Sequence, residues 1–560
     1  MSRSFLLVFL MGLLALFLLM MWVGQGAYIP SGAALVLDLG APIEEQRPGG
    51  ALGELTGPKA LLMHQISRGL RAAKDDARIA GLVVKISPLD AGWGKAGEIR
   101  DLIAEFRTSN KPAICFLEGE TIGNREYFLA TGCGEVWLIP SGVLGTTGMM
   151  AQSTFYKGTF EKLGIEPNVF GIAEYKTYRN QFTEKKYTAA HRESAEALLR
   201  SIFEHYIEQA SQARKIKPEG FLALLEGGPY LSAEAVENKL VDKVAYWDEV
   251  RGYFDQKHDG WKPVELPQYV KQVPNAGFDS VAVVRATGDI VMGGSGYDSW
   301  AGFIMGSDSV IADLRRARED DSVKAIVLRI DSGGGSAVAS ELIRREVELA
   351  QDAKPVVVSM SDVAASGGYW IAMSAKKIVA EPATVTGSIG VVFGKLNVSG
   401  LYTLLGLSTD HVATHENATI LWEQQNFTPA QREVVMKFMD DTYADFTAAV
   451  AENRGLKPEE VEKIARGRVW TGVQARGFKL VDEFGGLDRA IAVARDLAKI
   501  DPGRSVRILM LPEEKTVFQE LLEQTASQNL RADPLRAQLR RLTRPREWVQ
   551  ARLPFDLNIR

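Results

Sequence analysis

Cysteine is scarce in this sequence, and neither sign of charge is in large excess. The 560 residues include two cysteines, Cys115 and Cys133, which excludes a disulfide framework. Both lie in apolar stretches, so we expect two buried free thiols. The formal net charge of −5 lacks the basic footprint of a nucleic-acid-binding protein, and we expect no nucleic-acid partner. A chain of this length and ordinary composition, 46% hydrophobic and 24% charged, favours two or more globular domains.

One long stretch near the N-terminus contains no charge. Residues 5–23 are dominated by Leu, Phe and Met, Arg3 precedes them, and the next charged residue is Asp38. The stretch is long enough to cross a bilayer and longer than the usual apolar region of a signal peptide. By the positive-inside rule, the N-terminus stays in the cytoplasm and the rest of the chain crosses the membrane. We therefore expect a retained membrane anchor over residues 1–27, with a cleaved signal peptide as the alternative.

The remainder of the chain contains an internal duplication. Y-F-L-A at Tyr127 matches Y-W-I-A at Tyr369, a spacing of 242 residues (369 minus 127). The same spacing links Pro140 to Pro382, Gly145 to Gly387, Gly148 to Gly390 and Gly164 to Gly406. A chance match would not keep its register over so many positions. Each unit alternates short apolar strands with helices, which favours α/β layers with a largely parallel sheet.

The domain boundaries are predicted from these units. We expect the following segments: an anchor over 1–27, a first unit over 28–262, a proline-rich linker over 263–278, a second unit over 279–501 and a tail over 502–560. Strands are expected at 34–39, 81–87, 281–286 and 325–331, and long helices at 189–216 and 429–454. The tail is expected to be helical over 515–530. Its last thirty residues contain eight arginines and three acidic residues, which we interpret as a solvated basic end.

Chemistry is expected where the two units differ. An apolar run at 355–358 is typical of a buried strand, and 369–375 is typical of the first turns of a helix. Ser366 lies between them, followed by Gly367 and Gly368. A hydroxyl beside the free N–H groups of a helix start is the geometry that a nucleophile needs. A serine that only caps the helix is the alternative. The first unit has Asn124 opposite Ser366, so only the second unit can supply this nucleophile.

A second difference is a glycine-rich strand exit. The second unit has D-S-G-G-G-S at 331–336, where the first has S-P-L-D-A-G at 87–92. Such an exit exposes backbone N–H groups, and beside Ser366 these could complete an oxyanion hole.

The serine also needs a base. His411 and His415 follow Ser366 in the chain but lie in no recognisable catalytic context, and a strict G-x-S-x-G elbow is absent because residue 364 is alanine. A lysine can take this role if burial lowers its pKa. Lys176, in A-E-Y-K-T-Y-R-N-Q-F, has no lysine counterpart in the second unit, and it is the sharpest candidate. The sequence also allows each of these three side chains to be an ordinary surface residue.

Together, the anchor, the duplicated unit and the motifs S-G-G-G-S, A-A-S-G-G-Y-W and T-G-S-I-G-V resemble a known family. They are similar to the long, duplicated form of the signal peptide peptidase A (protease IV) family, peptidase family S49, within the ClpP/crotonase-like superfamily. The resemblance covers roughly residues 32–499. It implies an α/β fold with a tandem duplication of a ClpP/crotonase-like unit, preceded by one N-terminal transmembrane helix.

The same resemblance implies a Ser–Lys dyad divided between the units. Ser366 would be the nucleophile and Lys176 the general base, with Ser388 donating or accepting a hydrogen bond at the lysine amine. The oxyanion hole would use the N–H of Gly367 and of one glycine in the pair Gly334 and Gly335. The family usually has S-P-G-G where this chain has S-G-G-G at 332–335, which gives up the fixed φ of proline.

The implied function is a membrane-anchored serine endopeptidase. It would degrade released signal peptides and similar apolar peptides on the periplasmic side of the bacterial inner membrane, as a homotetramer and without metal or organic cofactor. Because an unshifted lysine has a pKa of about 10.4, burial would have to lower it, and we expect an alkaline activity optimum. The alternatives are a broader quality-control protease of the envelope, an acyl-CoA enzyme on the same superfold and a non-catalytic membrane scaffold.

Overall fold

The computed structural model describes residues 28–48, 60–257, 260–298, 301–513, 550–552 and 558–559. The anchor predicted over residues 5–23 and the helix predicted over 515–530 lie outside these ranges. Within them, no helix has the length and apolar character needed to cross a membrane.

The first unit is built on a six-stranded sheet. The strand order is β12-β7-β5-β4-β1-β13, and all neighbours are parallel. The strands are β1 (Ala33–Asp38), β4 (Ile79–Ile86), β5 (Ala113–Leu117), β7 (Glu135–Leu138), β12 (Lys243–Val244) and β13 (Pro263–Glu265). Helices α3 (Met63–Asp75) and α4 (Trp93–Arg107) pack on one face and α11 (Trp247–Lys257) on the other. Strands covered on both faces explain the nearly continuous apolar runs in the sequence.

The second unit repeats this sheet strand for strand. Its parallel core has the order β25-β21-β20-β18-β14-β26. The strands are β14 (Asp279–Thr287), β18 (Val323–Ser332), β20 (Val356–Ala365), β21 (Lys377–Ala380), β25 (Glu483–Phe484) and β26 (Val506–Leu511). Helices α13 (Ser307–Glu319) and α14 (Ala337–Ala353) cover one face and α20 (Leu487–Leu497) the other. The predicted α/β layers and duplication are confirmed.

Matching side-chain contacts show the same duplication. The hydroxyl of Tyr127 donates to the carbonyl of Leu240 at 2.8 Å, and that of Tyr369 donates to the carbonyl of Leu480 at 3.1 Å. The two long helices are α8 (Ala189–Arg214) and α17 (Pro429–Arg454), and each follows a threonine whose side chain caps its first turn. The helices predicted at 189–216 and 429–454 are therefore present.

Two segments that the sequence assigns outside the units carry sheet strands. The stretch predicted as a linker contains β13, which pairs with β1, and α12 (Leu266–Val270), whose Leu266 is buried in the first core. The predicted tail contains β26, which pairs with β14 in the equivalent position. The prolines suggested a linker, but Pro263 begins an edge strand and Pro267 lies in the first turn of a helix, where proline is tolerated.

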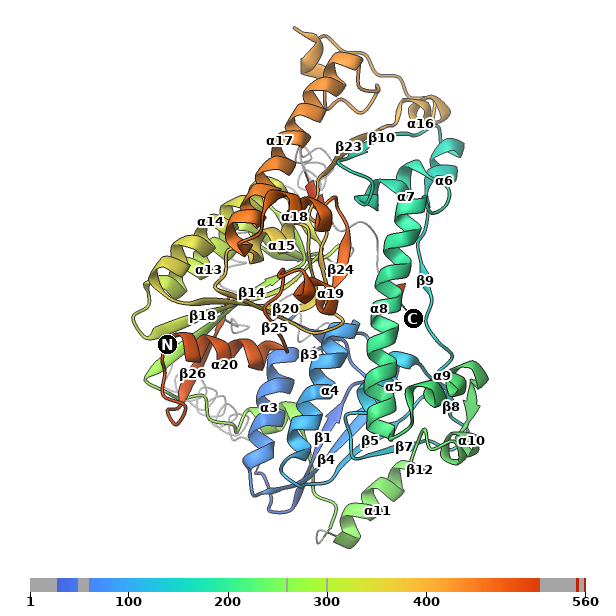
Figure 1. Cartoon of the computed structure of the whole chain (residues 1–560), viewed down its shortest axis with the longest axis vertical. Coiled ribbons are helices and arrows are strands. Elements are labelled where there is room, and N and C mark those ends of the chain that lie inside the picture. The colour runs from blue at the N-terminus through green and yellow to red at the C-terminus, as the bar shows by residue number, and fades with distance from the viewer. Residues whose placement is uncertain are drawn as a thin grey trace, which may run out of the picture.

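A third sheet joins the two units. Its strand order is β10-β23-β27-β19-β15-β17-β16. The strands are β10 (Glu166–Gly171), β15 (Asp289–Val291), β16 (Gly296–Asp298), β17 (Gly302–Gly306), β19 (Gly334–Ser336), β23 (Val392–Asn397) and β27 (Gln550–Arg552). β10 of the first unit runs antiparallel to β23 of the second, and the two lie side by side near the upper end of α17 (Figure 1). This pairing carries the segment after β10 into the second unit.

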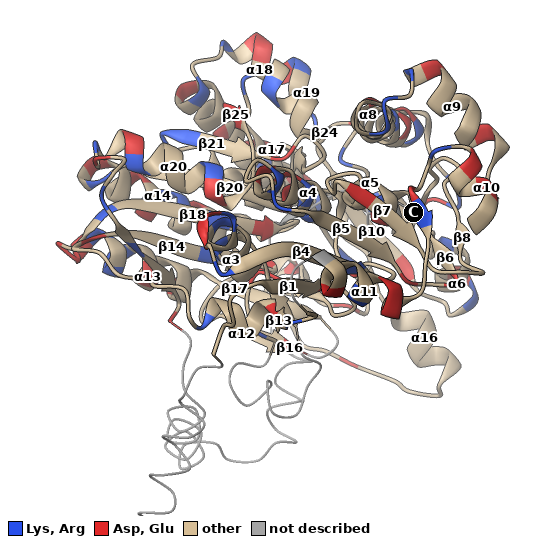
Figure 2. Ribbon diagram, turned by 90° about the horizontal axis from the view of Figure 1, so that it is seen from below, with Lys and Arg blue, Asp and Glu red and all other residues tan. Residues whose placement is uncertain are grey.

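Charged residues of both signs are interspersed over the outer helices (Figure 2), whereas a few charges are buried between the units. Arg329 of β18 is fully buried and lies 2.7 Å from both Glu45 and Glu98 of the first unit. Burial alone would raise the pKa of Glu45, but Arg329 lowers it to about 2. Burial raises the pKa of Glu98, although Arg329 acts in the opposite direction. The buried cluster joins the two units.

The two cysteines form a disulfide, so the expectation of two free thiols was wrong. Cys115 and Cys133 are bonded, with their Cα atoms 5.7 Å apart. Cys115 lies in β5, and Cys133 lies in the turn after α5 (Asn124–Ala130). The fold places this turn next to β5, a proximity that depends on tertiary packing and that the apolar sequence context does not reveal.

Candidate active site

Ser366 connects β20 to α15 (Gly367–Ala372) in a rarely occupied backbone conformation. Its φ is 57° and its ψ is −115°, a region that residues other than glycine seldom adopt. The side chain does not cap α15, so the structure does not support the interpretation as a plain helix cap. The Ser366 N–H donates to the carbonyl of Gly387 at 2.8 Å. The Ser366 hydroxyl is therefore not engaged by the first turn of α15.

Lys176 reaches this hydroxyl from the other unit. It lies between β10 and the 3-10 turn η1 (Thr177–Arg179), and the β10–β23 pairing continues when Ile172 N–H donates to the carbonyl of Val391 at 3.0 Å. Lys176 Nζ is 2.7 Å from Ser366 Oγ. Both residues are 0% exposed. The structure therefore brings the two predicted residues together, 190 positions apart in the chain.

Ser388 completes the contacts of the lysine amine. Lys176 Nζ lies 3.0 Å from both the carbonyl oxygen and the hydroxyl of Ser388, and the Ser388 hydroxyl donates to the carbonyl of Gly467 at 3.4 Å. Burial lowers the pKa of Lys176 well below its ordinary value, since a buried amine is less stable when charged. A neutral amine has two N–H donors and one lone pair. Donation to the two Ser388 oxygens leaves the lone pair for the proton of Ser366.

Two glycines allow the lysine to fit, and sequence reasoning missed their role. Gly467 has a φ of +81°, and a Cβ there would lie 2.5 Å from Lys176 N and 2.6 Å from its Cα. A Cβ on Gly390 would lie 2.8 Å from Gly467 Cα. Both glycines belong to the second unit and pack against a residue of the first. No signal in the sequence marks such a contact.

Ion pairs between the units flank the same lysine. Arg466 contacts Glu174 at 2.7 Å, and Arg468 contacts Glu193 at 2.8 Å. The two arginines stand on either side of Gly467. Arg466 holds the segment before Lys176, and Arg468 holds α8, against the turn before β24 (Val469–Thr471).

The glycine-rich exit lies beside the start of α15. A Cβ on Gly367 would be 3.1 Å from Gly334 Cα and 3.2 Å from Gly335 N. The Gly334 N–H donates to Ser332 Oγ at 3.1 Å, and Ser332 Oγ donates to the carbonyl of Gly288 at 2.7 Å. These bonds hold the loop in place without the proline that the sequence resemblance leads us to expect after Ser332. The three predicted oxyanion glycines are therefore adjacent.

The first unit also supports the base of this loop. Lys95 of α4 lies 2.8 Å from Asp331, the residue before the S-G-G-G-S run. The carboxylate of Asp362 accepts the backbone N–H groups of Gly92 and Lys95, both at 2.8 Å. An acid of the second unit thus caps the N-terminus of α4 in the first.

The histidine alternatives lie elsewhere. His411 and His415 are exposed, in the segment between α16 (Ser399–Leu404) and the 3-10 turn η2 (Glu416–Thr419). The ring of His411 packs on Trp422, with centroids 4.0 Å apart. Ser366 is fully buried and its hydroxyl contacts Lys176. Among the residues that the structure describes, no cluster of three or more His, Cys, Asp or Glu side chains could hold a metal ion.

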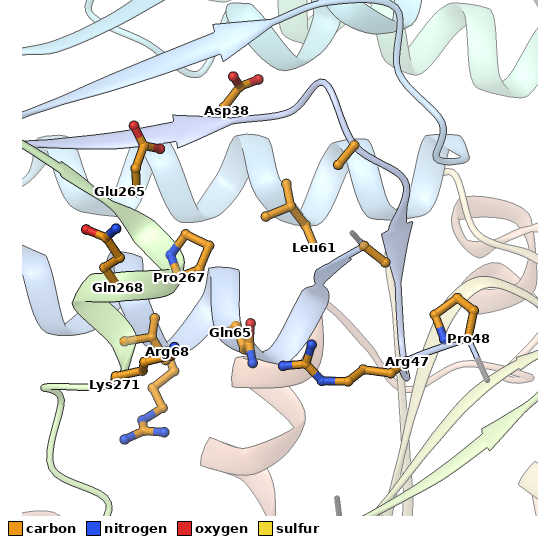
Figure 3. A pocket seen from close by; sticks show the side chains of 13 residues that line it. Asp38, Arg47, Pro48, Leu61, Gln65, Arg68, Glu265, Pro267, Gln268 and Lys271 are labelled. Atoms are coloured by element: carbon orange, nitrogen blue, oxygen red, sulfur yellow. The ribbon is translucent and has the colours of Figure 1, made fainter. Parts of the chain in front are cut away.

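Two cavities differ in their relation to this site. One of about 510 Å³ is lined by α3, α12 and the end of β1, with Asp38, Gln65 and Arg68 among its walls (Figure 3). Neither Ser366 nor Lys176 lines this cavity. A second cavity of about 270 Å³ adjoins the glycine-rich loop and is lined in part by Ser332 and Gly333.

Comparisons with known proteins bear on the family of this chain. The model of peptidase family S49 matches residues 105–259 and 348–501, one segment in each unit. The chloroplastic serine protease SPPA of Arabidopsis thaliana is 34% identical over 537 residues, which are 94% of this chain and 78% of that protein. Protease 4 of Salmonella typhi is 34% identical over 88% of this chain and 84% of its own length. A ClpP1 mutant of Listeria monocytogenes aligns over 37% of this chain and 92% of its own at 16% identity, with a TM-score of 0.24.

Proposed function

This chain belongs to peptidase family S49 and is a serine protease, and from that premise we propose that Ser366 and Lys176 are its catalytic dyad. The observation that carries the proposal is the 2.7 Å contact between a buried serine hydroxyl and a buried lysine amine. A lysine whose pKa burial has lowered is neutral at a pH where an ordinary lysine is charged, so it can accept the serine proton.

The proposed reaction follows from these contacts. Ser366 Oγ attacks the carbonyl carbon of a peptide bond while its proton passes to the lone pair of Lys176 Nζ. The N–H of Gly367 stabilises the oxyanion, with Gly335 as the second donor because the Gly334 N–H already donates to Ser332. Lys176 then protonates the leaving amine, and water hydrolyses the acyl-enzyme by the reverse sequence. These steps use no metal or organic cofactor.

Ser388 is proposed as a positioning residue. By accepting both N–H groups of the neutral amine, it orients the lone pair toward Ser366. Its own hydroxyl is held by the carbonyl of Gly467. The contact thus links the lysine to the glycine turn that packs over it.

We further propose the domain organisation given by the sequence. Residues 28–262 and 279–501 would be ClpP/crotonase-like units, joined by 263–278 and followed by a tail from 502, with β13 and β26 extending the two sheets beyond these limits. The family resemblance supports a homotetramer. Since Ser366 and Lys176 come from different units, one chain has one such dyad.

For location and substrate, we propose a protease anchored through residues 5–23 in the bacterial inner membrane, with its units on the periplasmic side. It would degrade released signal peptides and similar apolar peptides. The uncharged N-terminal stretch supports the anchor. The Cys115–Cys133 disulfide supports an oxidising compartment, where such bonds persist. Two bacterial relatives named Protease 4 agree with a proteolytic role.

Peptidase assays on the chain beginning at Tyr28 test the dyad. An apolar fluorogenic peptide would be offered to the wild type, Ser366→Ala, Lys176→Ala and the control Ser374→Ala, which changes a serine just beyond α15. We expect both dyad variants to lose at least about 10³-fold in kcat and the control to keep the wild-type rate. Circular dichroism would check that each variant folds. An active Lys176→Ala variant would show that the lysine is not the base.

A further inference from the structure

A short C-terminal strand lies inside the sheet that carries the active-site glycines. β27 (Gln550–Arg552) runs antiparallel to β19, pairing Gly334 with Arg552 and Gly335 with Ala551. On its other side it pairs with β23, where Gln550 lies opposite Val392. β27 also lies beside α15, the helix that begins directly after Ser366. The end of the chain therefore reaches the proposed oxyanion hole.

The position of β27 has the dimensions of a peptide-binding site. Neighbouring strands are about 4.8 Å apart, so β19 and β23 would be separated by a gap one strand wide without it. Each would then present an edge of unpaired N–H and C=O groups toward the gap. An extended peptide could fill that gap by adding one strand to both edges, a common mode of peptide recognition. Its backbone would pass Gly334, Gly335 and the start of α15.

We propose that residues 550–552 occupy the position of the substrate backbone and compete with peptide substrates. This inference rests on the proposed protease site. Ser366 and Lys176 are 0% exposed, although a peptide carbonyl has to come within about 3 Å of the hydroxyl for attack. A substrate must therefore displace part of the chain. β27 is the neighbour of β19, the strand that contains Gly334 and Gly335.

A second contact holds the same tail on the first unit. β28 (Asn558–Ile559) runs antiparallel to β9 (Ala151–Gln152), and β9 lies beside α8 (Figure 1). The tail thus pairs with strands of the second unit through β27 and with a strand of the first unit through β28. Because β27 has only three residues, its ladder is short. A longer peptide with more backbone pairs can displace it.

Two truncations separate the two contacts. One chain would end at residue 549, which removes β27 and β28, and the other at residue 552, which removes only β28. If the tail leaves the site free about 10% of the time, the apparent KM is raised about tenfold. We expect the KM of the chain ending at 549 to be about tenfold lower than that of the full chain, with little change in kcat. The chain ending at 552 should recover less, because it keeps β27.

A point substitution controls for effects of shortening the chain. Ala551→Pro removes a backbone donor and disfavours a strand paired on both sides, whereas Ala551→Ser keeps the backbone unchanged. We expect Ala551→Pro to lower KM in the full chain and Ala551→Ser to leave it at the wild-type value. Equal KM values in the full chain, Ala551→Pro and the chain ending at 549 would overturn the proposal.

Hydrogen exchange tests the same contact without relying on activity. In the Ser366→Ala background, the amides of 334–336 and 392–394 should exchange faster when the chain ends at 549. Adding a synthetic peptide of residues 546–560 should restore their protection. Unchanged exchange on truncation would overturn the tail contact even if the chain is an active protease. Faster exchange in a chain that cleaves no peptide would instead contradict the proposed function alone.

Discussion

At the scale of single residues, the chemistry depends on the protonation state of Lys176. Its amine is fully buried, and the contacts printed among the described residues are with oxygens of Ser366 and Ser388, not with a carboxylate. Neutral oxygens compensate less than an ion pair for the loss of water around a charge. The direction of the pKa change follows from burial. Activity should therefore rise with pH through a limb that belongs to this lysine, below the ordinary lysine value of about 10.4.

The same pKa change predicts a pH dependence of stability. Between the lowered folded pKa and the unfolded value of about 10.4, the unfolded chain binds a proton that the native chain does not. The free energy of unfolding should therefore rise with pH in this window, by at most about 1.4 kcal/mol per pH unit. The stability gained in this window is fully present above the pKa of the unfolded chain, and it is lost as the pH falls to the pKa of the folded protein. Lys176→Met removes it. Urea unfolding of both proteins at several pH values measures the difference, and parallel curves would contradict a neutral lysine.

Ser388 offers a test of positioning rather than of chemistry. Ser388→Ala keeps the carbonyl acceptor but removes the hydroxyl that accepts the second N–H of Lys176. A freed amine can rotate its lone pair away from Ser366, and we expect kcat to fall about 10²-fold with little change in KM. The ascending limb of the pH–rate profile should shift as well. A variant with the wild-type pH profile would show that Ser388 serves packing only. Ser374→Ala is the control.

At the scale of helices and strands, Asp362 couples the first unit to the glycine-rich loop. Its carboxylate accepts two N–H groups at the start of α4 and lies 3.6 Å from Lys95 Nζ, which also contacts Asp331. Asp362→Ala leaves these donors without their acceptor, and we expect a loss of about 1–2 kcal/mol in stability. Activity should also fall because Asp331 begins the loop. Asp352→Ala, an exposed change in the same unit, should leave both unchanged. Thermal unfolding and peptidase assays measure the two effects.

The same scale shows what sequence could and could not predict. Strands such as β14 and β18 were predictable because parallel strands buried on both faces are continuous apolar runs. β13 and β26 were missed because each is recognisable only as the neighbour of a strand far away in the chain. Ser366 and Lys176 stood out through motifs and the family resemblance. Gly467 and the Cys115–Cys133 pair did not, since their roles depend on contacts between distant segments.

At the scale of the whole molecule, the site exists only while the two units hold their relative position. The fully buried Arg329 pairs with Glu45 and Glu98 across the interface. Removing one partner of a buried ion pair leaves an uncompensated charge, which typically costs about 3–5 kcal/mol. Arg329→Met should therefore destabilise the protein strongly. It should also reduce activity before global unfolding, because Ser366 and Lys176 move with different units.

A triple variant separates charge from packing in this interface. Arg329→Met combined with Glu45→Gln and Glu98→Gln removes the uncompensated charges while keeping side chains of similar size. We expect it to recover a substantial part of the stability that Arg329→Met loses, since apolar or neutral replacements of a whole buried cluster are often tolerated. Recovery of activity in parallel would show that the interface acts by holding the dyad together. If stability returned while activity did not, the buried charges would act on Lys176 directly. Burial alone would then no longer explain the lowered pKa of Lys176.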